Sequence, residues 1–328
     1  MISKRQFINT LAAGAAVAAA PLAWSQASDF PRRPLKLLVG FPAGSPGDVL
    51  GRAFARELEV QLGQSVVVDN RPGATGLIAM DALTQAPADG HTLMLLVSTT
   101  TTALHFARKP LDMDKRFTPI GHFLGTRIVL VVNPKAVDVH NLDQFVAYAR
   151  RNPGVHYTGS GHGGLGHLGM ELFAQRSGLK LSFVAYKGMG AALEDVLAAR
   201  VPVMVLDANA ALPHVRAGTL RAIVAVSTQR APAFPELPTA LEQGVDSLQI
   251  DGMLGIVAPP KTPAPVVDRL RTALREASGS ESFLAAAKAA GNARVYMDAP
   301  EYAEWIRRDF ERWGQVIQTA GLLNAPGN

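Results

Sequence analysis

One order of predicted elements occurs twice along this sequence, and it constrains the fold more than any other feature. In its first occurrence, Leu35 to Phe41 (LKLLVGF) has the continuous apolar pattern of a buried strand, and Val49 to Leu62 has helical spacing. A strand at Ser65 to Val68, a helix at Ile78 to Gln85 and a strand at Thr92 to Val97 follow. This alternation predicts a mostly parallel sheet with helices on both faces.

The second occurrence begins after Pro153. Predicted strands at Val155 to Thr158, Leu181 to Tyr186 and Pro202 to Leu206 alternate with helices at Leu165 to Arg176 and Ala191 to Ala199. The sequence therefore predicts two α/β lobes of similar design.

Two further apolar runs connect the predicted lobes. Ile128 to Val132 would carry the chain into the second lobe, and Gly255 to Ala258 would carry it back. Three helices then complete the chain, at Pro265 to Ser278, Ser282 to Ala290 and Pro300 to about Ala320. Two crossings and a returning C-terminus predict a hinged body.

The first 27 residues have the pattern of an export signal. Lys4 and Arg5 precede an uncharged run from Leu11 to Trp24, and Ser25-Gln26-Ala27 has the small-residue spacing of a cleavage site. We expect cleavage after Ala27 and an exported mature protein. The pattern around Lys4 and Arg5 leaves the Sec and twin-arginine routes both open.

Composition excludes several classes of protein. The chain has no cysteine, which excludes disulfides and thiolate sites. The net charge is +5 and falls to +3 without Lys4 and Arg5, and the remaining charges are mixed along the chain. With no cluster of Lys and Arg, nucleic-acid binding is not expected.

A glycine-rich loop follows the first strand of each lobe, where open α/β sheets bind ligands. Gly159-x-Gly161-x-x-Gly164 matches a dinucleotide-binding loop, but the strand that should end in an acidic residue ends in Tyr186-Lys187-Gly188. The loop from Gly40 to Gly47 lacks the Gly-Lys-Ser/Thr of a triphosphate site. Glycines and exposed helix amides still favour an anion, so we predict an anion site without a nucleotide cofactor.

Two catalytic or metal alternatives are weaker. His162 and His167 are five residues apart, which is poor spacing for a metal even with Glu171 nearby. Ser160 lacks the Gly-x-Ser-x-Gly surroundings of a nucleophile. We therefore predict no metal, no catalytic residues and no enzymatic activity.

An ordered set of motifs resembles the Bug/TctC family, the periplasmic solute-binding proteins of tripartite tricarboxylate transporters. The motifs cover essentially the whole mature chain: LLVGFPAGSPGD, VVVDNRPGATG, ADGHTL, Tyr157-x-x-Ser160-Gly161-x-Gly163 with His167-Leu168, AYKG, and Leu212-Pro213-His214. The resemblance implies a type II-like periplasmic-binding-protein fold, with two parallel-rich sheets joined by a two-strand hinge. Residues 28–130 and 253–328 would form the first lobe, and the inserted residues 131–252 the second.

The resemblance also implies a function and a set of site residues. The lobes would close on a small carboxylate, and a monomer would deliver it to membrane permease subunits. The implied ligand-binding residues are Phe41, Ala43, Gly44, Ser45, Ser98, Thr99, Gly159, Ser160, Gly161, Gly163, Gly164, His167, Tyr186, Lys187, Gly188 and Asp207.

The chain departs from the family in both glycine-rich loops. The first loop reads Pro-Ala-Gly-Ser-Pro-Gly-Asp where the family commonly has Pro-Pro-Gly-Gly-x-Thr-Asp. The second loop has Gly164, Leu165 and Gly166 where the family usually carries Ser or Thr. Fewer hydroxyls and more space favour a bulkier or less polar ligand than a simple dicarboxylate. A ligand sensor for a signalling partner, or a hydrolase that uses the same cleft, remain alternatives.

For several residues the sequence also indicates a structural role. We expect His167 to brace its loop through hydrogen bonds, and Asp48 to complement the start of a helix. Arg71 is expected in a turn, paired with Asp69 or supporting the sheet, and the two tryptophans of the last helix are expected to pack it.

Overall fold

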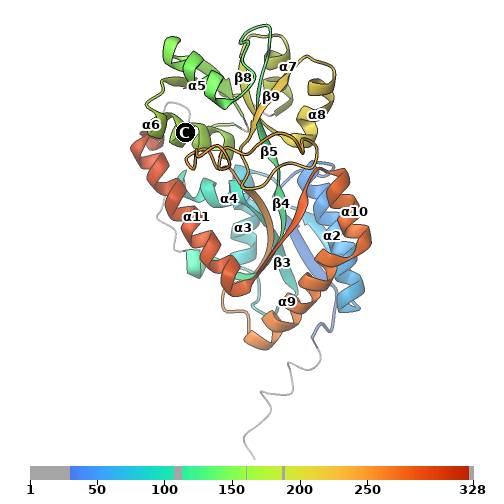
Figure 1. Ribbon diagram of the computed structural model, residues 1–328. Coiled ribbons are helices and arrows are strands. Elements are labelled where there is room, and N and C mark those ends of the chain that lie inside the picture. Colours follow the sequence, from blue (N-terminus) through green and yellow to red (C-terminus); the bar gives the residue numbers. More distant parts are fainter. Residues whose placement is uncertain (1–29, 107–112, 160, 187–188, 325–328) are drawn as a thin grey trace, which may run out of the picture.

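A computed structural model describes residues 30–106, 113–159, 161–186 and 189–324 (Figure 1). The described chain forms two lobes, and each contains its own β-sheet. The predicted signal segment, Ser160, Lys187 and Gly188 lie outside the described residues. In the part of the chain that is described, no helix has both the length and the apolar character needed to cross a membrane.

The first lobe is built on a six-stranded sheet with the order β11-β4-β10-β3-β1-β2. Strand β1 is parallel to β2 and β3, whereas β10 is antiparallel to β3 and β4, and β11 is antiparallel to β4. The strands are β1 (Leu35–Val39), β2 (Val66–Asn70), β3 (Thr92–Val97), β4 (Thr118–Thr126), β10 (Gly252–Ala258) and β11 (Ala293–Asp298).

Helices cover both faces of this sheet, as its apolar alternation requires. Leu35, Leu37 and Val39 pack toward α2, α9 and α10, where Phe54 stacks on Phe123. Leu38 packs toward the opposite face, which α3, α4 and α11 cover. The helices are α2 (Pro46–Leu62), α3 (Leu77–Thr84), α4 (Ser98–Ala103), α9 (Ala264–Gly279), α10 (Glu281–Ala289) and α11 (Ala299–Thr319).

The second lobe is built on a five-stranded sheet with the order β7-β6-β8-β5-β9. Strand β6 is parallel to β7 and β8, and β5 is antiparallel to β8 and β9. The elements are β5 (Ile128–Val132), β6 (Val155–Thr158), β7 (Leu181–Phe183), β8 (Val203–Asp207), β9 (Arg221–Ala225), α5 (Leu142–Arg151), α6 (Leu165–Ser177), α7 (Met189–Leu197) and α8 (Ala208–Arg216).

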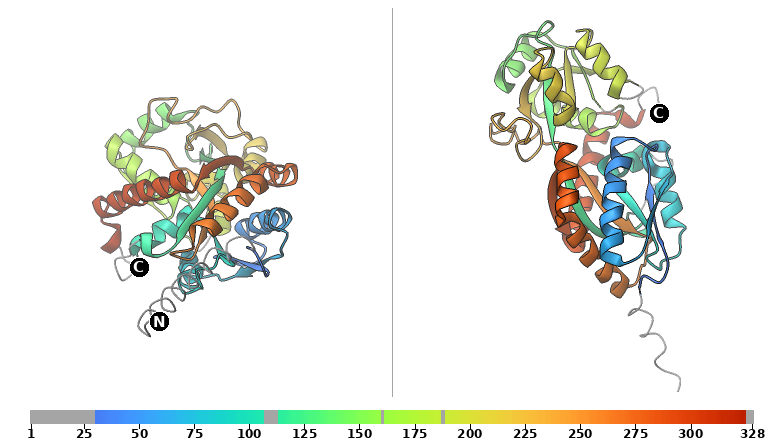
Figure 2. Two further views of the ribbon diagram at one scale, coloured as in Figure 1. Left: turned by 90° about the horizontal axis from the view of Figure 1, so that it is seen from below. Right: turned by 90° about the vertical axis from the view of Figure 1, so that its right-hand side faces the viewer.

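The two lobes are joined at the crossings and by the last helix. Arg127 alone separates β4 from β5, and residues 226–251 return the chain from β9 to β10. Helix α11 lies against both lobes (Figures 1 and 2). Its Tyr302 packs in the core of the first lobe, and its Trp313 is buried in the core of the second. The expected packing role of the last helix is therefore confirmed.

The two-lobed α/β class predicted from the sequence is confirmed, and both sheets are mixed. The parallel part of each sheet contains the strands of the predicted repeat: β1 to β3 in the first lobe, and β6 to β8 in the second. The antiparallel strands come mainly from the crossings and from elements that the sequence patterns did not show, such as β4, β9 and β11.

Candidate functional site

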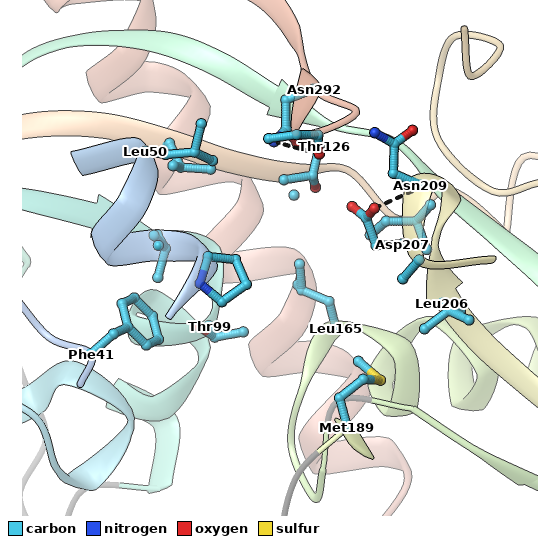
Figure 3. A pocket seen from close by; sticks show the side chains of 18 of the residues that line it. Phe41, Leu50, Thr99, Thr126, Leu165, Met189, Leu206, Asp207, Asn209 and Asn292 are labelled. Atoms are coloured by element: carbon cyan, nitrogen blue, oxygen red, sulfur yellow. Dashed lines mark hydrogen bonds between the residues drawn. The ribbon is translucent and has the colours of Figure 1, made fainter. Parts of the chain in front are cut away.

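A cavity of about 790 Å³ lies between the lobes, and both lobes line it (Figure 3). The first lobe contributes Phe41, Gly44, Pro46, Gly47, Val49, Leu50, Val97, Thr99, Thr126, Gly252, Met253, Leu254, Ala290 and Asn292. The second lobe contributes Ile128, Leu165, Gly166, Met189, Val205, Leu206, Asp207, Asn209 and Ala210.

The first wall of the cavity is residues 41–48, the loop after β1 and the first turn of α2. Ser45 is the N-cap of α2, and its hydroxyl accepts from the Asp48 N–H. The Asp48 carboxylate, only 2% exposed, accepts from the Gly44 N–H at 2.9 Å, from Arg52 Nε at 2.9 Å and from Asn70 Nδ2 at 2.8 Å. The predicted role of Asp48 at the start of a helix is confirmed.

The electrostatics of this wall favour an ionised Asp48. Burial alone would raise the pKa of Asp48, but the hydrogen bonds from Arg52, Asn70 and Gly44 outweigh it and lower that pKa to about 2. Asp48 therefore stays ionised beneath the surface of this wall, and its hydrogen bonds to Gly44, Arg52 and Asn70 compensate its negative charge.

Not every group of the first wall is free to meet a ligand. Phe41 and Gly44 line the cavity, whereas Ala43 and Ser45 lie outside its lining. The Gly44 N–H donates to Asp48, and the Ser45 N–H donates to the carbonyl of Pro42. The ligand contacts proposed for this loop stay predictions, and these two donors already have partners within it.

The second wall is residues 159–167, the loop after β6 and the start of α6. Gly161 and Gly163 have φ of +99° and +68°, values that favour glycine. Gly164 is the N-cap of α6, and as a glycine it has no side chain to cap that end. Leu165 and Gly166, the first two residues of α6, line the cavity. Their N–H groups belong to the set that an α-helix leaves without an intrahelical partner.

His167 is a buried residue that supports the loop of the second wall. Its ring is 2% exposed and stacks on Phe183 with centroids 3.9 Å apart. Burial, and to a lesser degree the neighbouring His162, lowers the pKa of His167 to about 3, so the ring is neutral near pH 7. Its Nδ1 accepts from the Gly163 N–H at 3.1 Å, which confirms the bracing role; a direct ligand contact stays a prediction.

The other predicted residues of the second loop lie behind the lining. Gly159 packs against α6, where an added Cβ would lie 3.4 Å from Gly166 Cα. Gly161, Gly163 and Gly164 are outside the lining residues of the cavity. Ser160 lies outside the described residues, so its ligand contact stays a prediction.

The remaining predicted residues are divided between lining and support. Thr99 lines the cavity, while the neighbouring Ser98 is buried and accepts from the Met253 N–H at 2.9 Å. Ser98 thereby fixes a lining residue of β10. Tyr186 lies outside the lining and donates its hydroxyl to Asp195 at 2.6 Å. Lys187 and Gly188 fall in the part of the chain that is not described.

Asp207 is the only charged side chain among the described lining residues. It is the N-cap of α8 and accepts from the Asn209 N–H at 3.0 Å. Burial raises the pKa of Asp207, and hydrogen bonds from the Asn209 and Ala210 amides partly oppose this rise. A donor on a ligand would stabilise this carboxylate, and a second negative charge would destabilise it.

Asn209 links the two lobes at the same end of the cavity. Its Nδ2 donates to the Ala289 carbonyl of the first lobe at 3.2 Å. The side chain packs against the backbone of Gly291, where an added Cβ would lie 2.1 Å from Asn209 Cγ. The neighbouring Asn292 is 7% exposed, and its Oδ1 has no hydrogen-bond partner in the described structure.

Sequence reasoning did not select many of the residues that line the cavity. Thr126, Ile128 and Gly252 flank the two crossings between the lobes. Their position in the sequence could have predicted that they line the cavity, because the crossings border the space between two lobes. Asn209 and Asn292 had no comparable signal, since they come together only through the contact between α8 and the turn after α10. Within the described ranges, no three His, Asp or Glu side chains gather closely enough to hold a metal ion.

Two α/β lobes that enclose a ligand-sized cavity beside their hinge define a two-lobed binding protein. Residues 50–322 match the family described as tripartite tricarboxylate transporter family receptor, TctC, and the chain belongs to this family. The Bug/TctC resemblance is thus confirmed. Receptors of this family are periplasmic solute-binding proteins for small carboxylates.

Individual relatives agree with this assignment. Protein BugT of Bordetella pertussis is 33% identical over 299 residues, which cover 90% of this chain and 91% of BugT. Rpa4515 of R. palustris, solved with adipate, is 30% identical with a TM-score of 0.73 and covers 89% of this chain and 99% of its own. MatC of Rhodopseudomonas palustris, with bound malate, is 26% identical with a TM-score of 0.71 and covers 88% and 100%.

Proposed function

We propose that this protein captures a small carboxylate between its lobes in the periplasm and delivers it to the membrane permease of a tripartite tricarboxylate-type transporter. The observation that carries the proposal is the uncapped N-terminus of α6, whose first two residues line the cavity between the lobes. The carboxylates in the structures of MatC and Rpa4515 support the same ligand class.

The charge of the ligand is held by dipoles in this proposal. The N–H groups of Leu165 and Gly166 and the positive end of the α6 dipole attract the carboxylate. Bridging waters complete its hydrogen bonds, because the N–H groups of Gly44 and Ser45 on the first wall already have partners. A site of this kind releases its ligand when a permease favours the open state.

Capture and release follow from the two-lobed design. A ligand that touches both walls binds the closed arrangement more tightly than the open one, and so shifts the population toward closure. Helix α11 packs in the cores of both lobes, so it limits the motion to a small change at the crossings. Export would depend on the basic and apolar segment before Ala27, which we propose is cleaved there.

Capping α6 from within the chain tests the carboxylate site directly. Gly164 has φ −74° and ψ 163°, a conformation that an N-cap aspartate adopts readily. In a Gly164→Asp variant, the new carboxylate should accept from the α6 amides and repel the ligand. We expect at least a tenfold loss of carboxylate affinity by calorimetry, with no loss of thermal stability.

Gly164→Ala is the matched control, since it adds the same Cβ without a charge or an acceptor. Its carboxylate affinity should stay within about threefold of that of the wild type. Unchanged affinity in Gly164→Asp would contradict the proposed site. Recovery of the ligand chemically unchanged after incubation would separate binding from turnover.

A further inference from the structure

We infer that the ligand is a monocarboxylate with a bulky, flat or branched apolar body and a hydrogen-bond donor, such as a hydroxyl, at the end remote from its carboxylate. This inference rests on the proposed carboxylate function and narrows it to one chemical class. It differs from the dicarboxylates malate and adipate in the structures of the two R. palustris proteins.

The size of the cavity is the first argument. Its volume of about 790 Å³ lies in the upper part of the range of roughly 300–1,000 Å³ that is usual for small-molecule sites. A four-carbon diacid would leave much of this space to water. A ligand with a ring or a branched chain would fill it and would contact both lobes at once.

The chemistry of the walls is the second argument. The lining of the cavity is mostly apolar, and both lobes contribute its apolar side chains (Figure 3). Burial of apolar ligand surface against such side chains is favourable, whereas a polar chain would lose water there without gaining partners. The side chains that carry this argument are Phe41, Leu50, Leu165, Met189, Val205 and Leu254.

The Asp207 side of the cavity is the third argument. In Figure 3, Leu165 at the start of α6 lies between Phe41 on one side of the view and Asp207 and Asn209 on the other. Asp207 presents a carboxylate to the cavity. A carboxylate is an acceptor, so it matches a donor on the ligand. A second carboxylate placed there would meet the charge of Asp207 at close range in a partly buried site, which is unfavourable.

A matched series of ligands tests the inference by calorimetry on the exported, purified protein. Benzoate carries a ring and one carboxylate, 4-hydroxybenzoate adds a donor at the remote end, and terephthalate adds a second carboxylate there. Succinate and adipate lack the ring, and benzyl alcohol lacks the carboxylate. We expect 4-hydroxybenzoate to bind at least tenfold more tightly than terephthalate, succinate and adipate, with benzoate between them.

The outcomes separate the two levels of the proposal. If adipate or succinate binds more tightly than 4-hydroxybenzoate, the inference is overturned while the carboxylate function stands. If benzyl alcohol binds as tightly as benzoate, or if none of the five carboxylates binds at millimolar concentration, the proposed function itself is overturned, and the inference with it.

Asp207→Asn tests the remote end on its own. Asparagine is also a good N-cap, so α8 and the fold should be retained. The variant should bind terephthalate at least threefold more tightly and 4-hydroxybenzoate at least threefold less tightly than the wild type does. Asp138→Asn removes the same charge from an exposed position of the second lobe outside the lining, and it should change neither affinity. An unchanged ratio of the two affinities in Asp207→Asn overturns the inferred donor.

Discussion

The two walls of the cavity have the same order of elements, but different interactions hold them. Each wall is a strand, a glycine-rich loop and a helix, and each places the start of that helix beside the ligand space. In the first wall a buried charge, Asp48, gathers donors from Gly44, Arg52 and Asn70. In the second wall a neutral ring, His167, accepts a single backbone N–H, and glycines allow close packing.

This difference explains which wall is suited to receive an anion. Three donors of the first wall, from Gly44, Arg52 and Asn70, are used by the Asp48 carboxylate, so the charge of Asp48 is compensated within the protein. The N-cap of α6 in the second wall is Gly164, which has no side chain to occupy the positive end of the helix dipole. One repeated pattern therefore produces one wall that contains a buried charge paired with its own donors and one wall with no such charge at the start of its helix.

The largest effect is expected from removal of the buried charge in the first wall. Asp48→Ala leaves Asn70, Arg52 and the Gly44 N–H without their acceptor, and it should lower the free energy of unfolding by about 3 kcal/mol in urea titrations. Asp143→Ala, at an exposed position in the first turn of α5, should cost less than about 1 kcal/mol. Equal losses in the two variants would show that the burial and hydrogen bonds of Asp48 add no stability to the first wall beyond that of an exposed carboxylate.

Close packing in the second wall should produce the next effect. An added Cβ at Gly166 would lie 3.1 Å from Val205 Cβ, so Gly166→Ala should cost about 2 kcal/mol through overpacking. At Gly44, where φ is +82° and no atom lies within 4 Å of an added Cβ, alanine should cost only about 1 kcal/mol of backbone strain. A Val205→Ala background should reduce the cost at Gly166 and leave the cost at Gly44 unchanged. The close-packing argument fails if the double-mutant cycle shows no coupling.

Acid should weaken the second wall before the first. The folded pKa of His167 is about 3 against an ordinary 6.5, so its contribution is complete above pH 6.5 and declines as the pH falls toward 3. Asp48 has a folded pKa of about 2 against 3.8, so its contribution is complete above pH 3.8 and is lost only below that value.

The neutral variant His167→Gln isolates the first of these two titrations. Between pH 7 and pH 5 it should remove about 1 to 2 kcal/mol of the pH dependence of unfolding, because glutamine takes up no proton. Urea titrations at both pH values measure this difference. An identical pH dependence in the variant and the wild type would show that His167 does not titrate as its burial requires.

Salt should have the smallest effect, and only in the first wall. The Arg52 side chain is 44% exposed, so its ion pair with Asp48 is partly screened. Arg52→Gln should lower stability by about 0.5 kcal/mol at low salt, and by less in 1 M NaCl. Gln175→Ala, which removes a neutral hydrogen bond near the end of α6, should show no such salt dependence. A cost of Arg52→Gln that is the same at both salt concentrations would mean that charge contributes little to this wall.

Much of the fold was predictable because its signals are local. The alternation of apolar strands with amphipathic helices predicted the parallel part of each sheet. Arg71 pairs with Asp69, only two residues away, as one of its two expected roles required. The sequence did not predict strand β4, because it contains Pro119, Gly121 and Gly125, residue types that usually weaken a strand. Gly121 allows the carbonyl of Met297 to approach closely, since an added Cβ would lie only 3.1 Å from that oxygen.

The sequence by itself determined the order of elements, the positions of both glycine-rich loops and the family to which the chain is similar. These follow from residue type and spacing along a short stretch of chain. Only the tertiary structure decided that Asp48 takes up three donors of one wall, that Gly164 is the N-cap of α6, and that Asp207, Asn209 and Asn292 line the same cavity. Those relations join residues from elements far apart in sequence, and long-range contacts of this kind leave no periodic trace in the chain.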